Sequence, residues 1–503
     1  MRSKKAMYNI VTNLLLQLIV IVYGFIVPKI IISMFGSNVN GLISSITQFL
    51  AYIALLESGF GPVVKSALYK PISNKDNKAI AGILKTTEKF FRNIAYIFLV
   101  YILILCVVYP LLVRNDFSWI YTVSLIIIIG ISTFAEYFFG MTYRLFLQAN
   151  QKTYIISLIQ IVTYILSIIF IVVLAQIGAN IQIIKLVSGI VFVLRPLLQN
   201  LYVKRKYNIN FNDCTERYEL KQKWDGLAQH IAAVIHSNTD ITILTIFCSL
   251  KEVSVYSIYY LVVKGVKSII QSFNSGIDAS FGDMIAKKEI DNLNKKFNMY
   301  EVMYFTIVTI IFTSTIILIT PFISVYTKGI TDANYVRYVF GYLIVISEYI
   351  WAIRLPYSSV VLAAGHFKET RKGAWIEALS NIIISILLVW KFGIVGVTIG
   401  TIVAMTIRTM EFIYHANKYI IYRNVLNSLK KLCIVILETL IIVLISRFFP
   451  YFDNTSYINW MFNGVITLIV SAVIVIIINS IIYKKDMKLF FDIFKNFFIR
   501  KSR

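Results

Sequence analysis

The chain has 503 residues, of which 58% are apolar and only 15% are Asp, Glu, Lys or Arg, whereas soluble domains carry about 25% charged residues. Apolar stretches of about 20 residues, the length that crosses a bilayer, recur from end to end, and no Pro- or Gly-rich linker marks off a soluble domain. This composition excludes a soluble globular protein, and it leaves no module through which the net charge of +24 could serve nucleic-acid binding.

Fourteen apolar segments predict fourteen transmembrane helices. In chain order they are 9–34, 41–69, 93–113, 118–143, 154–178, 181–203, 226–248, 253–283, 299–327, 335–362, 373–391, 393–415, 432–449 and 458–483. The first follows a basic start but is too long for the apolar region of a signal peptide and lacks a small-x-small cleavage site. We therefore interpret it as a retained first span.

The Lys and Arg residues are distributed very unevenly between the two sides of this arrangement. If the N-terminus is cytoplasmic, 35 of the 49 lie in cytoplasmic segments and only five in the opposite loops. Cytoplasmic loops of membrane proteins carry such an excess. The distribution predicts a multi-pass protein with both termini in the cytoplasm, and it accounts for most of the net charge.

Pairs of similar residues recur at a nearly constant offset along the chain. Glu136-Tyr137 is matched by Glu348-Tyr349 at an offset of 212, and Arg195 by Arg408 at 213. Because each half contains six spans, an even number, both halves begin on the same side of the membrane. This predicts a parallel repeat. We expect an all-α integral membrane protein with these parts: a six-span repeat at 1–203, a cytoplasmic linker at 204–225, a second six-span repeat at 226–420, two added helices at 421–483, and a basic amphipathic tail at 484–503.

Cationic side chains inside the predicted spans need a partner, a watery cavity or a function, because each costs about 2.5–3.5 kcal/mol at a helix centre. Lys264 and Lys267 lie on one face of their segment. They indicate either a cavity that attracts an anion or a span in which one lysine reaches the surface. Lys29 allows the same two interpretations, and Arg354 could join the cavity.

A helix break is predicted in the second span, where Glu57 is followed by Gly59, Gly61 and Pro62. Broken helices in membranes are tolerated where they line a cavity. A looser break at 274–276 lies near the matching position of the second half, so the repeat predicts a central site between the halves.

Two acids are candidates for ion coupling. Asp240 has His236 one turn before it and could bind a proton or Na⁺, or it could be a neutral, hydrogen-bonded group in a helix interface. Glu57 is the second candidate. For Glu136 and Glu348 we expect structural pairing with neighbouring helices.

Nothing in the sequence indicates catalysis or a resident cofactor. GxSxG, P-loop, HExxH and CxxC motifs are absent, and the four cysteines, Cys106, Cys214, Cys248 and Cys433, do not have the spacing of metal ligands. We expect a protein that is not an enzyme and holds no metal.

The chain resembles the multidrug/oligosaccharidyl-lipid/polysaccharide (MOP) exporter superfamily, and within it the polysaccharide branch of Wzx-type flippases. The resemblance is carried by the span count, the repeat and the following text: Val27-Pro28-Lys29-x4-Met34-Phe35-Gly36-x4-Gly41-Leu42, Gln48-Phe49-x5-Leu55-x3-Gly59, Asn238-Thr239-Asp240 and Val255-Tyr256. Lipid II flippases are less similar, because their Arg-Asp pair is absent after Gly24-Phe25. Multidrug exporters of the superfamily have twelve spans and more acidic cavities.

This resemblance implies a flippase of the bacterial cytoplasmic membrane for cell-surface polysaccharide biosynthesis. It would move undecaprenyl-pyrophosphate-linked oligosaccharide units outward by alternating access, with Lys29, Lys264, Lys267 and Arg354 around the pyrophosphate. A monomer working beside a polymerase and glycosyltransferases is expected. Two alternatives stay open: an ion-coupled drug or metabolite antiporter of the multidrug (MATE) branch, and a non-transporting scaffold of envelope assembly.

Overall fold

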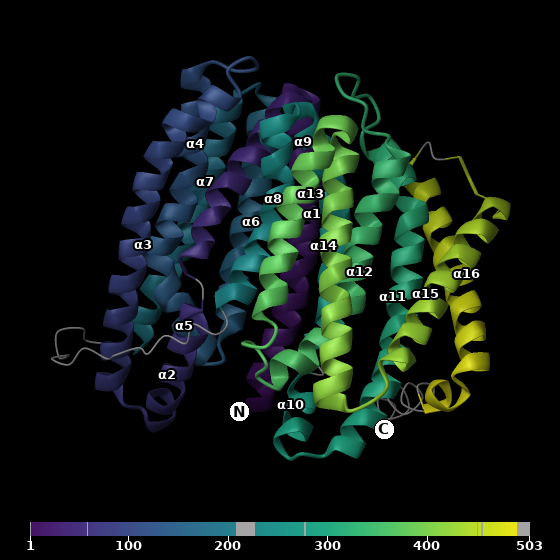
Figure 1. Ribbon diagram of the computed structural model, residues 1–503. Coiled ribbons are helices and arrows are strands. Elements are labelled where there is room, and N and C mark those ends of the chain that lie inside the picture. Colours follow the sequence, from purple (N-terminus) through teal and green to yellow (C-terminus); the bar gives the residue numbers. More distant parts are fainter. Residues whose placement is uncertain are drawn as a thin grey trace. The chain divides into compact units, whose positions relative to one another are not determined.

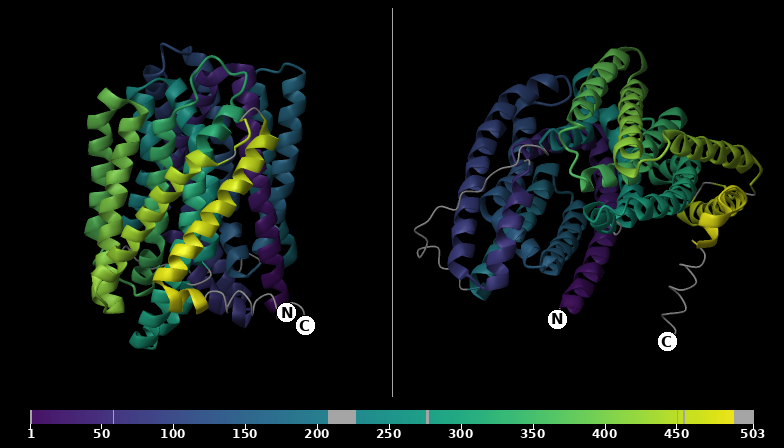
Figure 2. Two further views of the ribbon diagram at one scale, coloured as in Figure 1. Left: turned by 90° about the vertical axis from the view of Figure 1, so that its right-hand side faces the viewer. Right: turned by 60° about the horizontal axis from the view of Figure 1, so that its bottom comes forward.

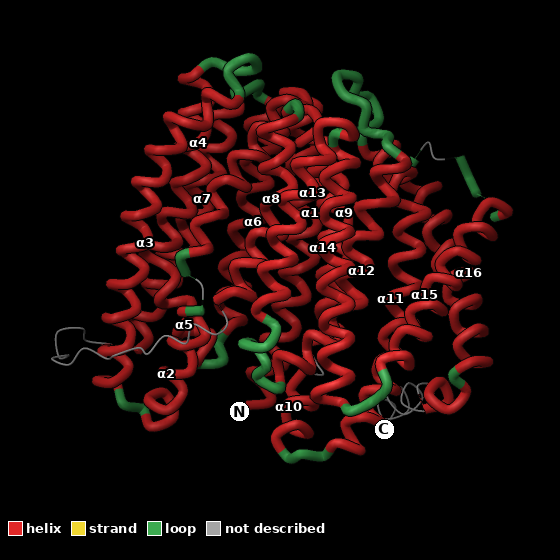
Figure 3. The backbone as a smooth tube through the Cα atoms, in the orientation of Figure 1, coloured by secondary structure: helices red, strands yellow, loops and turns green. Residues whose placement is uncertain are grey.

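The computed structural model describes residues 2–57, 59–207, 227–275, 278–449, 451–453 and 456–489. These residues are almost entirely helical and contain no β-strand (Figure 3). Eleven of their helices are long and apolar enough to cross a membrane, so the chain is a multi-pass membrane protein. The chain forms two compact units, Met1–Ser254 and Val255–Arg503.

Unit 1 is a bundle of long helices with two interruptions (Figure 1). Its elements are α1 (Arg2–Ala51), the 3₁₀ turn η1 (Tyr52–Leu55), α2 (Phe60–Asn74), α3 (Asn77–Leu112), α4 (Trp119–Ala135), the π-helical turn η2 (Glu136–Gly140), α5 (Met141–Ala149), α6 (Thr153–Gln176), α7 (Ile181–Tyr207) and α8 (Leu227–Phe247). Helix α6 packs on α1 and α7, and α4 packs on α7 and α3.

Helix α1 contains the first expected span and the first part of the second, joined at a kink. Gly36 has φ 84° and ψ 172°, a conformation that is not helical and that is essentially reserved for glycine. The two spans therefore meet without a loop, because one glycine absorbs the change of direction.

The second span is interrupted after η1. Gly59 has a left-handed backbone (φ 78°) and directly precedes α2. Gly61 and Pro62 then fall in the first turn of α2, where a missing N–H costs nothing, because the first N–H groups of a helix have no partner within it. The break leaves Glu57 in the gap between the two helical pieces.

Helix α8 and the start of α9 (Leu250–Ser275) pack against the second half of α1 through a row of hydrogen bonds. Asn40 donates to the Ser254 hydroxyl at 2.8 Å, and the Ser45 and Thr245 hydroxyls are 2.7 Å apart. At Gly41 a Cβ atom would lie 1.8 Å from the Leu250 carbonyl oxygen, so only glycine fits there. Unit 1 ends at Ser254, one helix later than the predicted six-span repeat at 1–203. The repeat itself stays a prediction.

Unit 2 contains the remaining helices. They are α9 (Leu250–Ser275, whose first turn belongs to unit 1), α10 (Asp278–Ala286), α11 (Ile290–Tyr326), α12 (Tyr338–Ala363), α13 (Arg371–Phe392), α14 (Ile394–Ala416), the π-helical turn η5 (Asn417–Ile421), α15 (Val425–Ile445), the 3₁₀ turn η6 (Ser446–Phe448) and α16 (Tyr457–Ile482). Helices α13 and α14 form a closely packed hairpin, and α11 contacts α12, α15 and α16 (Figure 2).

The fourteen expected segments can all be assigned to helices. The two expected segments that are not among the eleven apolar helices, 226–248 and 432–449, correspond to α8 and α15. Helix α9 ends at Ser275, within the second expected break. Of the expected linker (204–225), residues 208–225 lie outside the described residues. Of the expected tail (484–503), residues 490–503 do.

Candidate functional site

Unit 1 contains a charged cavity of about 290 Å³ beside the helix break. It is lined by Glu57 from the break, Ser132 and Thr133 from α4, Glu136 and Tyr137 from η2, Met141 and Arg144 from α5, and Phe192 and Arg195 from α7. Two carboxylates and two guanidinium groups therefore share one cavity within the membrane bundle. We call it the unit 1 cavity.

Arg195 is fixed by three neighbours. Its guanidinium carbon lies 4.1 Å from the ring centre of Tyr164 and 4.0 Å from that of Phe192, and its Nε donates to the Thr163 hydroxyl at 2.7 Å. Cation–π contacts of this kind hold a guanidinium away from bulk water. Its Nη2 is buried without a hydrogen-bond partner among the described residues, so one donor remains for a ligand or water.

The acids of the unit 1 cavity differ in their pairing. Glu136 accepts from Arg144 at 3.1 Å, which is the structural pairing expected for this glutamate. Glu57 has its Oε2 atom buried without a partner among the described residues. The cavity thus offers one open acceptor and one open donor, a combination suited to a polar, uncharged group with hydroxyls.

The other two predicted site residues of unit 1, Lys29 and Asp240, do not line this cavity. Lys29 lies on α1 and is partly buried. Asp240 is buried on α8, next to the row of hydrogen bonds that joins α8 to α1. The side chain of its expected neighbour His236 lies outside the described residues.

In unit 2 the two lysines of α9 have different environments. Lys267 forms a 2.7 Å ion pair with Glu348 of α12, and its ammonium lies 4.1 Å from the ring centre of Trp351. Lys264 is exposed and forms no ion pair with any described residue. One lysine of the pair is therefore neutralised, which gives Glu348 its expected structural partner, and the other keeps its charge available.

Arg354 belongs to a buried charge network between α12, α13 and α14. Its Nη1 lies 2.6 Å from Glu377 Oε1, and the second oxygen of Glu377 lies 3.4 Å from Arg408 Nε. Arg408, only 1% exposed, also pairs with Glu411 and stacks on Phe412. Two cations and two acids balance each other here, so Arg354 links helices in this state.

A further charge cluster, which the sequence did not reveal, surrounds Glu301 of α11. Glu301 is fully buried and accepts from Arg423 at 2.7 Å, from Lys431 at 2.6 Å and from Ser428 at 2.9 Å, as well as from Tyr357. We call this group the Glu301 cluster. It ties α11 and α12 to α15, the first of the two added helices. One sequence signal could have pointed to this cluster. Glu301 is an acid within an apolar segment, and no Lys or Arg lies three or four residues from it.

Metal binding finds no support in the part of the chain that the structure describes. No group of three or more His, Cys, Asp or Glu residues there could hold a metal ion. Two histidines, His366 and His415, do meet with their ring nitrogens 2.9 Å apart, but they form only a pair.

No protein-family model and no curated protein sequence matches the chain significantly. Solved structures do match. The lipid II flippase MurJ in an inward closed conformation superimposes with a TM-score of 0.69 at 16% identity, covering 95% of this chain and 98% of that one. An inward-facing multidrug resistance MATE family transporter of the MOP superfamily gives 0.59 at 14% identity, with coverages of 80% and 94%. The eukaryotic MATE transporter AtDTX14 gives 0.53 at 14% identity, with coverages of 86% and 98%.

These similarities confirm the expected fold class. The chain has the helical fold shared by a lipid II flippase and by MATE transporters of the MOP superfamily. The polysaccharide branch, the substrate and the roles of the individual site residues stay predictions.

Proposed function

We propose that the protein is a flippase that moves pyrophosphate-linked oligosaccharide lipids from the cytoplasmic to the outer leaflet of a bacterial membrane. The observation that carries the proposal is the extent of the fold match. A flippase for a lipid-linked substrate covers 95% of this chain, whereas the two MATE transporters cover 80% and 86%. Alternating access is the mechanism that such a repeated helical fold supports.

Charge pairing favours Lys264 as the residue that contacts the pyrophosphate. Lys267 and Arg354 each have a carboxylate partner, so a phosphate would have to displace an existing ion pair to reach them. Lys264 has no such competitor among the described residues, and a lysine ammonium binds phosphate as a point charge. Lys29, which is partly buried on α1, is a second candidate, in unit 1.

The unit 1 cavity suits a polar role in the same cycle. We propose that Glu57 and Asp240 respond to a coupling proton or Na⁺, because acids buried in a membrane bundle mark ion pathways. A polymerase and glycosyltransferases are proposed as partners, since a flipped repeat unit must be made before and consumed after this step.

The test is a flipping assay on the purified protein in liposomes that contain a synthetic undecaprenyl-pyrophosphate disaccharide. A membrane-impermeant glycosidase, added outside, cleaves only the sugars of the outer leaflet, so flipping appears as cleavage of the inner pool. We expect K264Q to slow flipping by about ten- to a hundredfold, as for loss of one charge-assisted contact worth about 1.5–3 kcal/mol. K287Q is the matched control, because it removes one lysine charge from an exposed surface pair with Asp283.

Three outcomes would count against the proposal or part of it. Flipping by K264Q at the wild-type rate would refute the role of Lys264. A wild-type protein that leaves the inner pool uncleaved would refute the flippase. Resistance of expressing cells to cationic compounds, lost on E57Q or D240N, would instead indicate the antiporter.

A further inference from the structure

Helix α15 carries a buried acid that none of the sites described above includes. Glu438 is 0% exposed, and neither of its carboxylate oxygens has a hydrogen-bond partner among the described residues. Its neighbours one turn away on the same face, Val435 and Ile442, are buried and apolar. A charged carboxylate in such surroundings would be strongly destabilised, so the group is neutral in this state and holds a proton.

The charges nearest to Glu438 lie toward one end of α15. Lys431 lies seven residues earlier on the same face, about 10 Å along the helix axis at 1.5 Å per residue, and it is bound to Glu301 at 2.6 Å. The hydroxyls of Tyr349 on α12 and of Tyr483 after α16 lie within electrostatic range of the Glu438 carboxyl. The Glu301 cluster also contains Arg423, and Asp486 joins it through Asn298.

Polar side chains also line the contact of α11 and α16. Helix α16 buries Asn463, Thr467, Ser471 and Asn479, which follow one another at intervals of four or eight residues and so share one face. Asn479 donates to Thr306 of α11 at 3.0 Å, and the Ser314 and Ser471 hydroxyls are 3.3 Å apart. A polar seam of this kind is costly between helices that could pack through apolar groups, which suggests that it has a function.

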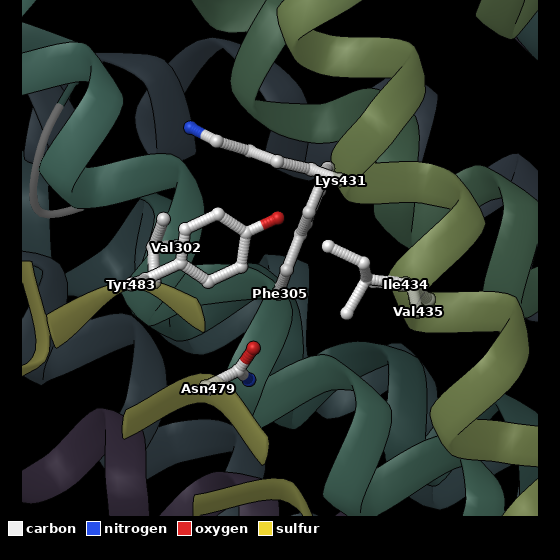
Figure 4. A pocket seen from close by; sticks show the side chains of 7 residues that line it. All are labelled: Val302, Phe305, Lys431, Ile434, Val435, Asn479 and Tyr483. Atoms are coloured by element: carbon white, nitrogen blue, oxygen red, sulfur yellow. The ribbon is translucent and has the colours of Figure 1, made fainter. Parts of the chain in front are cut away.

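A small pocket lies beside Lys431 of the Glu301 cluster, where residues of α11, α15 and α16 meet (Figure 4). It is lined by Val302, Phe305, Lys431, Ile434, Val435, Asn479 and Tyr483, and its volume of about 10 Å³ is close to the space that one water needs. The Tyr483 hydroxyl points into it and has no partner among the described residues, and the Asn479 amide approaches from the side opposite Lys431. The pocket is thus polar enough to hold a water one turn of α15 from Glu438.

We propose that Glu438 is a proton-binding site, and that its proton exchanges with the aqueous side at the Glu301 cluster through Tyr483 and a water in this pocket. The proton passes from the carboxyl by way of the Tyr483 hydroxyl to that water and then to solvent, and it leaves a carboxylate on Glu438. A metal ion fits less well, because the adjacent Thr439 hydroxyl already donates to the Val435 carbonyl at 2.8 Å and no cluster of metal ligands is present among the described residues.

The first test is an infrared titration of the full-length protein in lipid nanodiscs. The wild type should show the C=O band of a protonated carboxylic acid that E438Q lacks, and this band should disappear reversibly as the pH rises and shift in heavy water. Y483F should slow the hydrogen–deuterium exchange of this acid by about a hundredfold, the lower end of what a positioned proton-transfer group contributes. E289Q, which changes the exposed glutamate at the N-cap of α11, is the matched control.

The outcomes separate the site from the transport function. If the wild type and E438Q have the same acid bands, or if the band responds to neither pH nor heavy water, the proton site is refuted. The link to transport rests on the proposed function: an imposed pH gradient should change the flipping rate of the wild type but not of E438Q. A gradient effect that persists in E438Q refutes the coupling, whereas absence of flipping refutes the flippase and leaves the infrared result to decide the site.

Discussion

Substitution of Glu301 by Gln removes the only acid that directly contacts Arg423 and Lys431 in the Glu301 cluster. The carboxylate is fully buried, and it receives hydrogen bonds from both cations and from two hydroxyls. A glutamine keeps the shape and one acceptor, but its amide group turns N–H donors toward two cations that are themselves donors only.

The expected loss follows from the burial of the cations. Their side chains are 4% and 7% exposed, so neither can recover hydration without opening the bundle. Loss of one partner from a buried ion pair costs about 3–5 kcal/mol. Asp486 remains near Lys431 and offsets part of this, so we expect E301Q to lose about 3 kcal/mol, a change of about two orders of magnitude in the unfolding equilibrium constant.

Unfolding of the purified protein in detergent, followed by tryptophan fluorescence against denaturant, measures this loss. E289Q makes the same chemical change at the exposed N-cap position before α11 and should stay within about 0.5 kcal/mol of the wild type. If E301Q unfolds at the same denaturant concentration as E289Q, the Glu301 cluster does not stabilise unit 2 and the reasoning is wrong.

Two further predictions concern single contacts. K267Q should cost about 3 kcal/mol because it removes the ion pair that Lys267 forms with the buried Glu348 carboxylate. The double variant K267Q/E348Q should recover about 0.5–3 kcal/mol of the summed single losses. Additive losses in the same unfolding assay would show that the pair is not coupled. Gly36→Ala should destabilise the protein by about 1–3 kcal/mol, since the backbone conformation of Gly36 is essentially glycine-only. Gly265→Ala, at a helical position with open space around it, should be neutral or stabilising by up to about 1 kcal/mol. Equal effects of the two substitutions would contradict the assigned kink.

The helices could be predicted because their signal is local. A run of about 20 apolar residues defines a span wherever it occurs, and Gly59-x-Gly61-Pro62 disfavours a regular helix through its own backbone chemistry. The join at Gly36 was less accessible: the expected gap between 34 and 41 suggested a loop, whereas one glycine suffices and α1 continues through it.

The partners of the charges could not be predicted, because they depend on which helix faces meet. Lys267 and Glu348 are 81 positions apart, and Glu301 lies 122 and 130 positions from Arg423 and Lys431. The sequence showed that the Lys267 ammonium, inside an apolar segment, required stabilisation. A watery cavity and an ion pair would stabilise it equally well. Only the packing of α9 on α12 distinguishes them in this state.

The π-helical turn at 136–140 fixes the direction in which the side chains after it point. An α-helix turns about 100° per residue, and a π turn accommodates one residue more than an α turn. Helix α4 packs on α3 and α7, whereas α5, beyond the turn, also contacts α2. Deleting one residue there would leave a more regular helix, yet would rotate everything after it by about 100° and aim Arg144 away from Glu136. The helix itself could form without this residue, but the unit 1 cavity would lose its arrangement of charges. The number of residues between Ala135 and Met141 therefore determines how the charged side chains of α5 are oriented toward the cavity.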